Sequence, residues 1–122
     1  MAKVRIWQYA GCSTCKKALK WLDQRQIAYE SVAIVDNPPS KSALKKLWKR
    51  SGLPIRRLFN TSGASYREGG FGDRLGTMSE DEALEALAAD GKLIKRPLLD
   101  AGEFVLVGFK ETDYADAFDR SG

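Results

Sequence analysis

Two cysteines three residues apart are the residues of this sequence best suited to chemistry. Cys12 and Cys15 lie in "YAGCSTCKKALKWLD", between a short β-prone stretch and the start of a helical pattern. Such a pair can act as a redox couple, bind a metal ion, or simply pack as small apolar side chains. The rest of the chain must supply whatever each of these functions requires.

A metal site would need more ligands than this pair provides. Structural zinc takes four N, S or O ligands. The chain contains two cysteines and no histidine. No carboxylates are paired at ligand spacing, so we expect no metal site within one chain.

A redox couple, in contrast, suits the position of the pair at the start of a helix. Cys12 would lie at the helix N-terminus and Cys15 one turn later on the same face. Unpaired backbone N–H groups and the positive end of the helix dipole would stabilise a thiolate at Cys12, and Lys16 and Lys17 add positive charge nearby. The more enclosed Cys15 could then attack an adduct on Cys12 and release the product. The alternative is two half-buried cysteines that only fill space; the sequence favours the redox couple.

A second segment that could take part is "LIKRPLL". The bond before Pro97, just ahead of an expected hairpin, suits a fixed and even cis peptide, although an ordinary loop proline is the alternative. Arg96 could offer its planar guanidinium to a thiolate or an oxyanion. A lone arginine is more often a solubilising surface residue.

The apolar spacing predicts the elements that would position these residues. A strand at Val4–Trp7, a helix from Ser13 or Thr14 to about Gln24 and a strand at Tyr29–Val35 form a βαβ unit. Such units are normally parallel and right-handed.

Helices are then expected to follow. Ser40 would cap a helix that stops at Gly52, and Ser79 with Glu82 forms a capping box for a helix that ends at Gly91. The Gly-rich residues 54–78 between them suggest short helical pieces joined by loops. A hairpin with strands at Leu98–Leu99 and Phe104–Val107 comes next, and Tyr114, Ala117 and Phe118 mark a last helix. The order predicts an α/β fold with a mixed sheet and a helical insertion.

Length and composition limit the class of protein. The 122 residues fit one compact domain, and 43% apolar and 30% charged residues suit a soluble protein with a real core. No apolar run approaches the ~20 residues of a membrane helix, and the first residues lack the apolar segment of a signal peptide. We therefore expect a cytoplasmic monomer without membrane contact, in which the thiols are mostly reduced.

The net charge of +4 is unevenly distributed. Seven basic and no acidic residues lie between Lys41 and Arg57, and five acidic and no basic residues between Glu80 and Asp90. This asymmetry fits either a docking surface for an acidic partner or ordinary solvated helix faces. No nucleic-acid motif accompanies it, so direct DNA binding is not expected.

Several separated motifs together resemble one known family. These are "GCSTCKKALKWL", "NTSGASYRE", "LIKRPLL" and "VLVGFKETDYADAF", and the resemblance runs from about Val4 to Phe118. They look like the arsenate-reductase-like branch of the thioredoxin fold. This branch includes glutathione- and glutaredoxin-linked arsenate reductases (ArsC), the YffB proteins and the transcriptional regulator Spx.

The resemblance implies roles for individual residues. Cys12 matches the nucleophile, which in arsenate reductases attacks arsenic before glutathione and glutaredoxin regenerate the thiol. Arg96 matches an arginine beside the nucleophile, and Pro97 matches the family's cis proline. Two further arginines assist oxyanion binding in the reductases, and their positions fall at Asn60 and near Lys110. We expect these substitutions to weaken binding of a doubly charged oxyanion.

Two function classes follow from the resemblance. The first is a thiol oxidoreductase with no bound cofactor, with Cys15 as resolving thiol, Lys16 beside the site, and glutathione, glutaredoxin or another thiol as reductant. The second is a regulator like Spx, in which the CxxC pair is a redox switch and the partner is the C-terminal domain of the RNA polymerase α subunit. The reductase is the favoured hypothesis.

Overall fold

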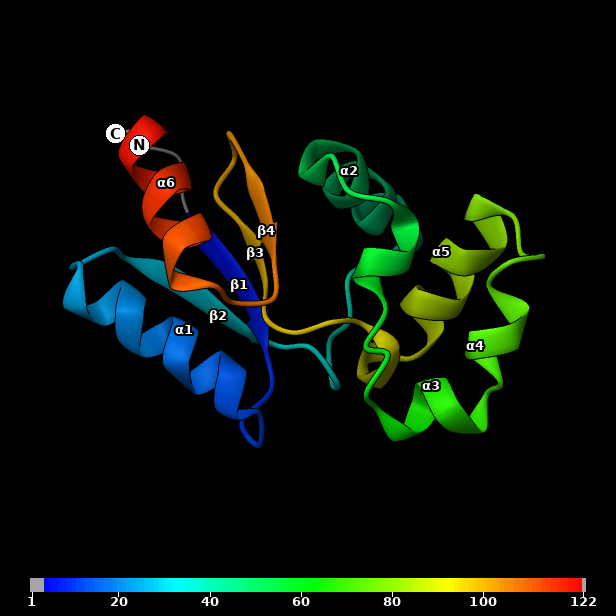
Figure 1. Cartoon of the computed structure of the whole chain (residues 1–122). Helices are drawn as coiled ribbons and strands as arrows, with labels where there is room; N and C mark the ends of the chain where they lie inside the picture. Colours follow the sequence, from blue (N-terminus) through cyan, green and yellow to red (C-terminus); the bar gives the residue numbers. More distant parts are fainter. Residues whose placement is uncertain (1–3, 122) are drawn as a thin grey trace. The chain divides into compact units, whose positions relative to one another are not determined.

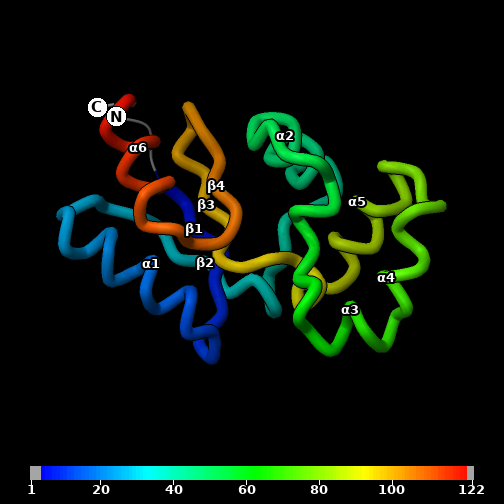
Figure 2. The backbone as a smooth tube through the Cα atoms, viewed as in Figure 1, coloured from blue at the N-terminus to red at the C-terminus, as the bar shows by residue number. Residues whose placement is uncertain are grey.

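The computed structural model describes residues 4–121 and divides the chain into two compact units (Figure 1). The sheet unit comprises Met1–Ala33 and Arg96–Gly122, and the helical unit comprises Ile34–Lys95. The chain leaves the sheet unit after the first βαβ segment and returns to it before the hairpin, as the tube in Figure 2 shows. The expected helical insertion is confirmed.

The sheet unit contains four strands in the order β2-β1-β3-β4. The first two strands pair in parallel, whereas β1 with β3 and β3 with β4 pair antiparallel, so the expected mixed sheet is confirmed. The elements are β1 (Val4–Gln8), α1 (Ser13–Gln24), β2 (Tyr29–Ala33), β3 (Leu98–Asp100), β4 (Val105–Val107) and α6 (Glu111–Ser121). Of the described residues, no helix is long and apolar enough to cross a membrane.

Helices α1 and α6 pack on one face of the sheet because their apolar stripes meet there. The Trp21 ring of α1 lies edge-on to Tyr114 of α6, with 5.6 Å between ring centroids. The shared core also holds Ile6 of β1 and its cross-strand partner Leu99, both fully buried. This packing fixes the start of α1, where the cysteines lie, against the end of β1.

Four strand ends differ from the prediction. Strands β1 and β3 each extend one residue further, to Gln8 and Asp100. The other two differences arise from packing. Strand β2 stops at Ala33 instead of Val35, because Ile34 turns into the helical unit and is fully buried there, with its carbonyl against Gly91. In the hairpin, Phe104 lies in the turn rather than in β4, since its carbonyl accepts a hydrogen bond from the Ala101 N–H. Ile34 and Phe104 have the apolar side chains expected of a strand, but both residues pack outside the strands.

The helical unit follows the expected caps closely. The Ser40 hydroxyl accepts the Ala43 N–H, and Ser79 and Glu82 form the complete capping box. Residues 54–78 form short helical pieces, as predicted. The elements are α2 (Lys41–Ser51), η1 (Ile55–Leu58), α3 (Ala64–Glu68), α4 (Phe71–Arg74), α5 (Glu80–Ala89) and η2 (Gly91–Leu93).

The oppositely charged segments meet within this unit. Lys41 Nζ of α2 lies 2.7 Å from Asp81 Oδ1 and 3.9 Å from Glu85 Oε2 of α5. Four other basic side chains of α2 remain exposed: Lys45, Lys46, Lys49 and Arg50. Part of the charge asymmetry therefore serves an internal contact, and the docking hypothesis stays a prediction.

Candidate functional site

Cys12 is the N-cap residue of α1. Its backbone is extended (φ −95°, ψ 115°), and its Sγ accepts a hydrogen bond from the Cys15 N–H at 3.3 Å. The Cys12 carbonyl accepts the first helical bond from the Lys16 N–H at 3.1 Å. A sulfur in this position takes the place of a Ser or Asp cap, whose side chain accepts a backbone N–H of the first turn. The side chain is half-buried and thus open to a reactant.

Cys15 lies one turn into α1 and is fully buried. Burial, followed by the interaction with Cys12, raises the pKa of the Cys15 thiol to about 12. At neutral pH this residue is therefore protonated in the resting protein. Both cysteines are unbridged in this structure. The two sulfurs thus lie in different environments: Cys12 Sγ at the N-terminus of α1, and Cys15 Sγ in the interior one turn later.

Arg96 and Pro97 connect the helical unit to β3. The Arg96–Pro97 peptide bond is cis, in keeping with the family resemblance. The Pro97 carbonyl accepts a hydrogen bond from the Gly108 N–H at 2.8 Å, which ties this segment to the end of β4. The positive charge of Arg96 acts on Cys15 and works against the rise of its pKa. The structure therefore brings Arg96, Cys12 and Cys15 to one end of the sheet unit.

Tyr9 joins this group although the sequence analysis gave it no role. Its carbonyl accepts the Cys12 N–H at 3.0 Å, and its ring lies 5.0 Å from Arg96 Cζ, measured to the ring centroid. An aromatic residue just before a CxxC pair was a signal that could have been noticed. Its pairing with Arg96, far along the chain, could not be read from spacing.

The other three predicted site residues are Lys16, Lys110 and Asn60. Lys16 is exposed on the first turn of α1. Lys110 is exposed and directly precedes α6, where its carbonyl accepts the Tyr114 N–H at 3.1 Å. Asn60 belongs to the helical unit, and its backbone N–H donates to the Leu93 carbonyl at 2.8 Å. Roles for these residues stay predictions.

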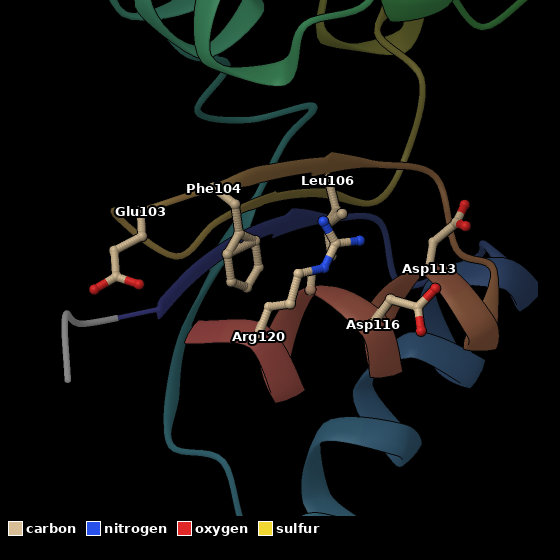
Figure 3. Close-up of a pocket in the computed structure, with 7 residues that line it drawn as sticks. Glu103, Phe104, Leu106, Asp113, Asp116 and Arg120 are labelled. Carbon is tan, nitrogen blue, oxygen red and sulfur yellow. The ribbon is translucent and has the colours of Figure 1, made fainter. Parts of the chain in front are cut away.

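A groove of about 470 Å³ lies in the sheet unit away from the predicted residues (Figure 3). Phe104 and Leu106 come from the hairpin side, and Asp113, Asp116 and Arg120 come from α6, as Figure 3 shows. The lining contains no cysteine and none of the residues predicted for the site. In residues 4–121, no group of three or more Cys, Asp or Glu side chains gathers in a way that could hold a metal ion.

Several known proteins are similar in sequence to this chain. The protein YusI of Bacillus subtilis is 50% identical over 111 residues, which cover 91% of this chain and 94% of YusI. An arsenate reductase of Neisseria meningitidis is 31% identical and covers 88% of this chain and 92% of its own length. Relatives that carry the names Spx and YffB are also found.

A solved structure extends the likeness to three dimensions. An ArsC-family-related protein from Bacteroides fragilis superimposes with a TM-score of 0.91 at 46% identity, over 93% of this chain and 96% of that one. The thioredoxin-like fold class is thus confirmed. The ArsC family model matches residues 7–117. This span includes both cysteines, Arg96 and Pro97, and the chain belongs to the ArsC family.

Proposed function

We propose that this chain is a thiol oxidoreductase in which Cys12 is the nucleophile and Cys15 the resolving thiol. The observation that carries the proposal is the Cys12 Sγ at the N-cap of α1, with the Cys15 N–H donated to it at 3.3 Å. The pair combines a half-buried sulfur that can meet a reactant with a fully buried sulfur one turn behind it. That asymmetry is what a nucleophile and a resolving thiol need.

The electrons balance over two steps. With a disulfide substrate, the Cys12 thiolate attacks one substrate sulfur, the substrate S–S bond breaks, and one thiolate leaves. Cys15 then attacks Cys12, a Cys12–Cys15 bond forms, the second substrate thiol departs, and the Cys15 proton ends on that departing sulfur. The substrate gains two electrons and the protein loses two. Glutathione, glutaredoxin or another thiol reductant would return the pair to its reduced state.

Arsenate is the second substrate to consider, since relatives carry the name arsenate reductase. In this case Cys12 would bond to arsenic with loss of water. Glutathione or Cys15 would then attack the Cys12 sulfur, so that a disulfide forms, the S–As bond breaks, and its electron pair passes to arsenic, which leaves as arsenite. Arg96 would neutralise part of the oxyanion charge through its planar donors. Lys110, which stands near where the resemblance places a further arginine, would add an ammonium, a less directional donor than a guanidinium. We therefore expect arsenate to be reduced slowly.

A redox regulator is the second candidate function. The same cysteine pair can form a disulfide that changes a docking surface, and relatives named global transcriptional regulator Spx 2 are found. A pull-down with the isolated C-terminal domain of the RNA polymerase α subunit separates the candidates. Retention that differs between reduced and oxidised protein would favour the regulator, and absence of retention in both states would favour the reductase.

The first test of the reductase is a single-turnover thiol count. Fully reduced protein is mixed with arsenate, with and without glutathione, and free thiols are counted by mass spectrometry against an untreated sample. Arsenate-dependent loss of the Cys12 thiol would support reductase chemistry on arsenate. If only diamide or a disulfide consumes the thiols, arsenate is not the substrate; if none does, the proposed roles of Cys12 and Cys15 are wrong.

A further inference from the structure

Among the described residues, Tyr9 is a large hydrophobic residue with an exposed side chain, and 42% of its surface is accessible to solvent. It directly follows β1, so burial on the sheet cannot explain its type. Its backbone serves the site, because its carbonyl accepts the Cys12 N–H at 3.0 Å. Any residue could supply that carbonyl, however. The reason for a tyrosine must lie in its ring.

The ring makes two close contacts. The guanidinium carbon of Arg96 lies 5.0 Å from the ring centroid, within the range of a cation–π interaction. The edge of the ring lies close to Gly11, where an added Cβ would come 2.9 Å from Tyr9 Cε2. Because Gly11 has no side chain, the Tyr9 ring has room to lie beside Arg96.

Support from a ring differs from support by a carboxylate. A carboxylate would neutralise Arg96 and occupy its N–H donors, whereas an aromatic ring holds the guanidinium by its flat face and leaves those donors unused. Among residues 4–121 no ion pair or hydrogen bond to the Arg96 side chain is found. The guanidinium thus retains its charge and its donors while its position is held.

We propose that Tyr9 is a positioning residue for Arg96, and that the pair makes Cys12 prefer reactants that carry an anionic oxygen, such as a carboxylate or an oxyanion. The inference rests on Cys12 as the nucleophile of the proposed function. The ring of Tyr9 holds the guanidinium, the guanidinium attracts the anionic group, and the reactant's electrophilic atom is thereby concentrated at Cys12. Tyr9 itself forms no bond to the reactant in this scheme.

The test compares two alkylating probes of similar size and different charge. Iodoacetate is an anion and iodoacetamide is neutral, and both transfer one alkyl group to a thiolate with loss of iodide. Their second-order rates are measured with Cys15→Ser protein, which retains Cys12 as its one thiol. The ratio of the two rates cancels the intrinsic nucleophilicity of Cys12 and reports the charge that a reactant meets.

We expect the iodoacetate-to-iodoacetamide ratio to fall by about threefold to tenfold in Tyr9→Leu and in Arg96→Gln. The double variant should fall no further than Arg96→Gln, because the ring acts only through the guanidinium. Tyr9→Phe keeps the ring and should stay within about twofold of the parent protein. Gly11→Ala, which displaces the ring without removing it, should lower the ratio in the same direction.

Arg25→Gln is the matched control. Arg25 also stacks on an aromatic ring, with its Cζ 4.5 Å from the Trp21 centroid, and its removal changes the net charge by the same amount. It lies at the far end of α1, a 12-residue helix of roughly 18 Å. The ratio should be unchanged in this variant.

Each outcome decides the proposal. If Arg96→Gln lowers the ratio and Tyr9→Leu and Gly11→Ala do not, Tyr9 does not position Arg96. If Arg96→Gln leaves the ratio unchanged, the pair does not select anions at all. Both results would overturn this inference while Cys12 remains reactive, so the proposed function would survive. If neither probe alkylates Cys12 in any variant, the nucleophile assignment fails, and the inference falls with it.

Discussion

Cys12 and Cys15 are the same residue type in the same helix, yet their surroundings give them different chemistry. Cys12 Sγ accepts a backbone N–H at the start of the helix, and its half-buried side chain can be reached by a reactant. Cys15 is fully buried, and burial raises its pKa to about 12. This difference in exposure and hydrogen bonding supports the division of roles that we propose for the two cysteines.

Alkylation should distinguish the two thiols. In the reduced protein at about pH 7.5, iodoacetamide should label Cys12 and leave Cys15 unmodified, since a thiol with a raised pKa is scarcely ionised there. Peptide mapping by mass spectrometry over a time course measures the order of labelling. Labelling of Cys15 should become fast only as the pH approaches its pKa or when the protein is unfolded. Equal rates at both cysteines in the folded protein would contradict the assignment.

Loss of the resolving thiol should trap the first intermediate. With a small disulfide as substrate, Cys15→Ser should accumulate a mixed disulfide on Cys12, because no second thiol can displace it. Intact-mass measurement should show one substrate half added per chain, whereas the parent protein passes on to the internal disulfide. Cys12→Ser should show no addition. Equal accumulation in the parent protein and in Cys15→Ser would remove Cys15 from the mechanism.

At the scale of elements, the sequence predicted the starts of helices better than the ends of elements: α5 ends at Ala89 and not at Gly91, which begins η2. The Ser79–Glu82 capping box and the Ser40 cap are local patterns, and both are present. The end of β2 at Ala33 depends on where Ile34 is buried, which no local pattern contains. The same limit applies to the site. The Cys12–Cys15 pair and the Arg96–Pro97 segment could be recognised in the sequence. The contact of the Tyr9 ring with Arg96 could not, because it depends on tertiary packing.

The contact that ends β2 can be tested through Gly91. An added Cβ at this residue would lie 2.1 Å from the Ile34 carbonyl oxygen and 3.0 Å from Val35 Cα, and neither backbone atom can move cheaply. We expect Gly91→Ala to lower the free energy of unfolding by about 2–3 kcal/mol, as for other overpacked interiors. Urea denaturation followed by circular dichroism gives the value.

Gly76→Ala provides the matched control for this substitution. An added Cβ at Gly76 meets no heavy atom within 4 Å. The same chemical change should therefore be neutral or stabilise the protein by a few tenths of a kcal/mol, since alanine restricts the unfolded chain. Similar losses in both variants would mean that the close approach of Gly91 to Ile34 is not what matters.

At the scale of the whole molecule, two buried acids should make folding sensitive to high pH. Burial is the largest cause that raises the pKa of Tyr114, and it also raises the pKa of Cys15 from 9.0 to about 12. Both groups keep their protons in the folded chain at pH values where the unfolded chain releases them. Stability from these groups is therefore complete below about pH 9 and is lost as the pH rises toward the folded pKa values.

The Tyr114→Phe variant isolates one of these two contributions. At neutral pH it should be less stable by about 1–2 kcal/mol, because the Gly108 carbonyl loses the hydroxyl that donates to it. Above about pH 10 the gap to the parent protein should narrow, since phenylalanine has no proton to lose. Urea midpoints by circular dichroism between about pH 7 and 11 measure both effects.

The Cys15→Ala variant tests the other contribution. The difference in stability between this variant and the parent protein should begin to narrow at a lower pH, near the ordinary thiol pKa of about 9. The double variant combines Tyr114→Phe with Cys15→Ala. If its free energy of unfolding fell with rising pH as steeply as that of the parent protein, groups other than Tyr114 and Cys15 would control the alkaline unfolding of the protein.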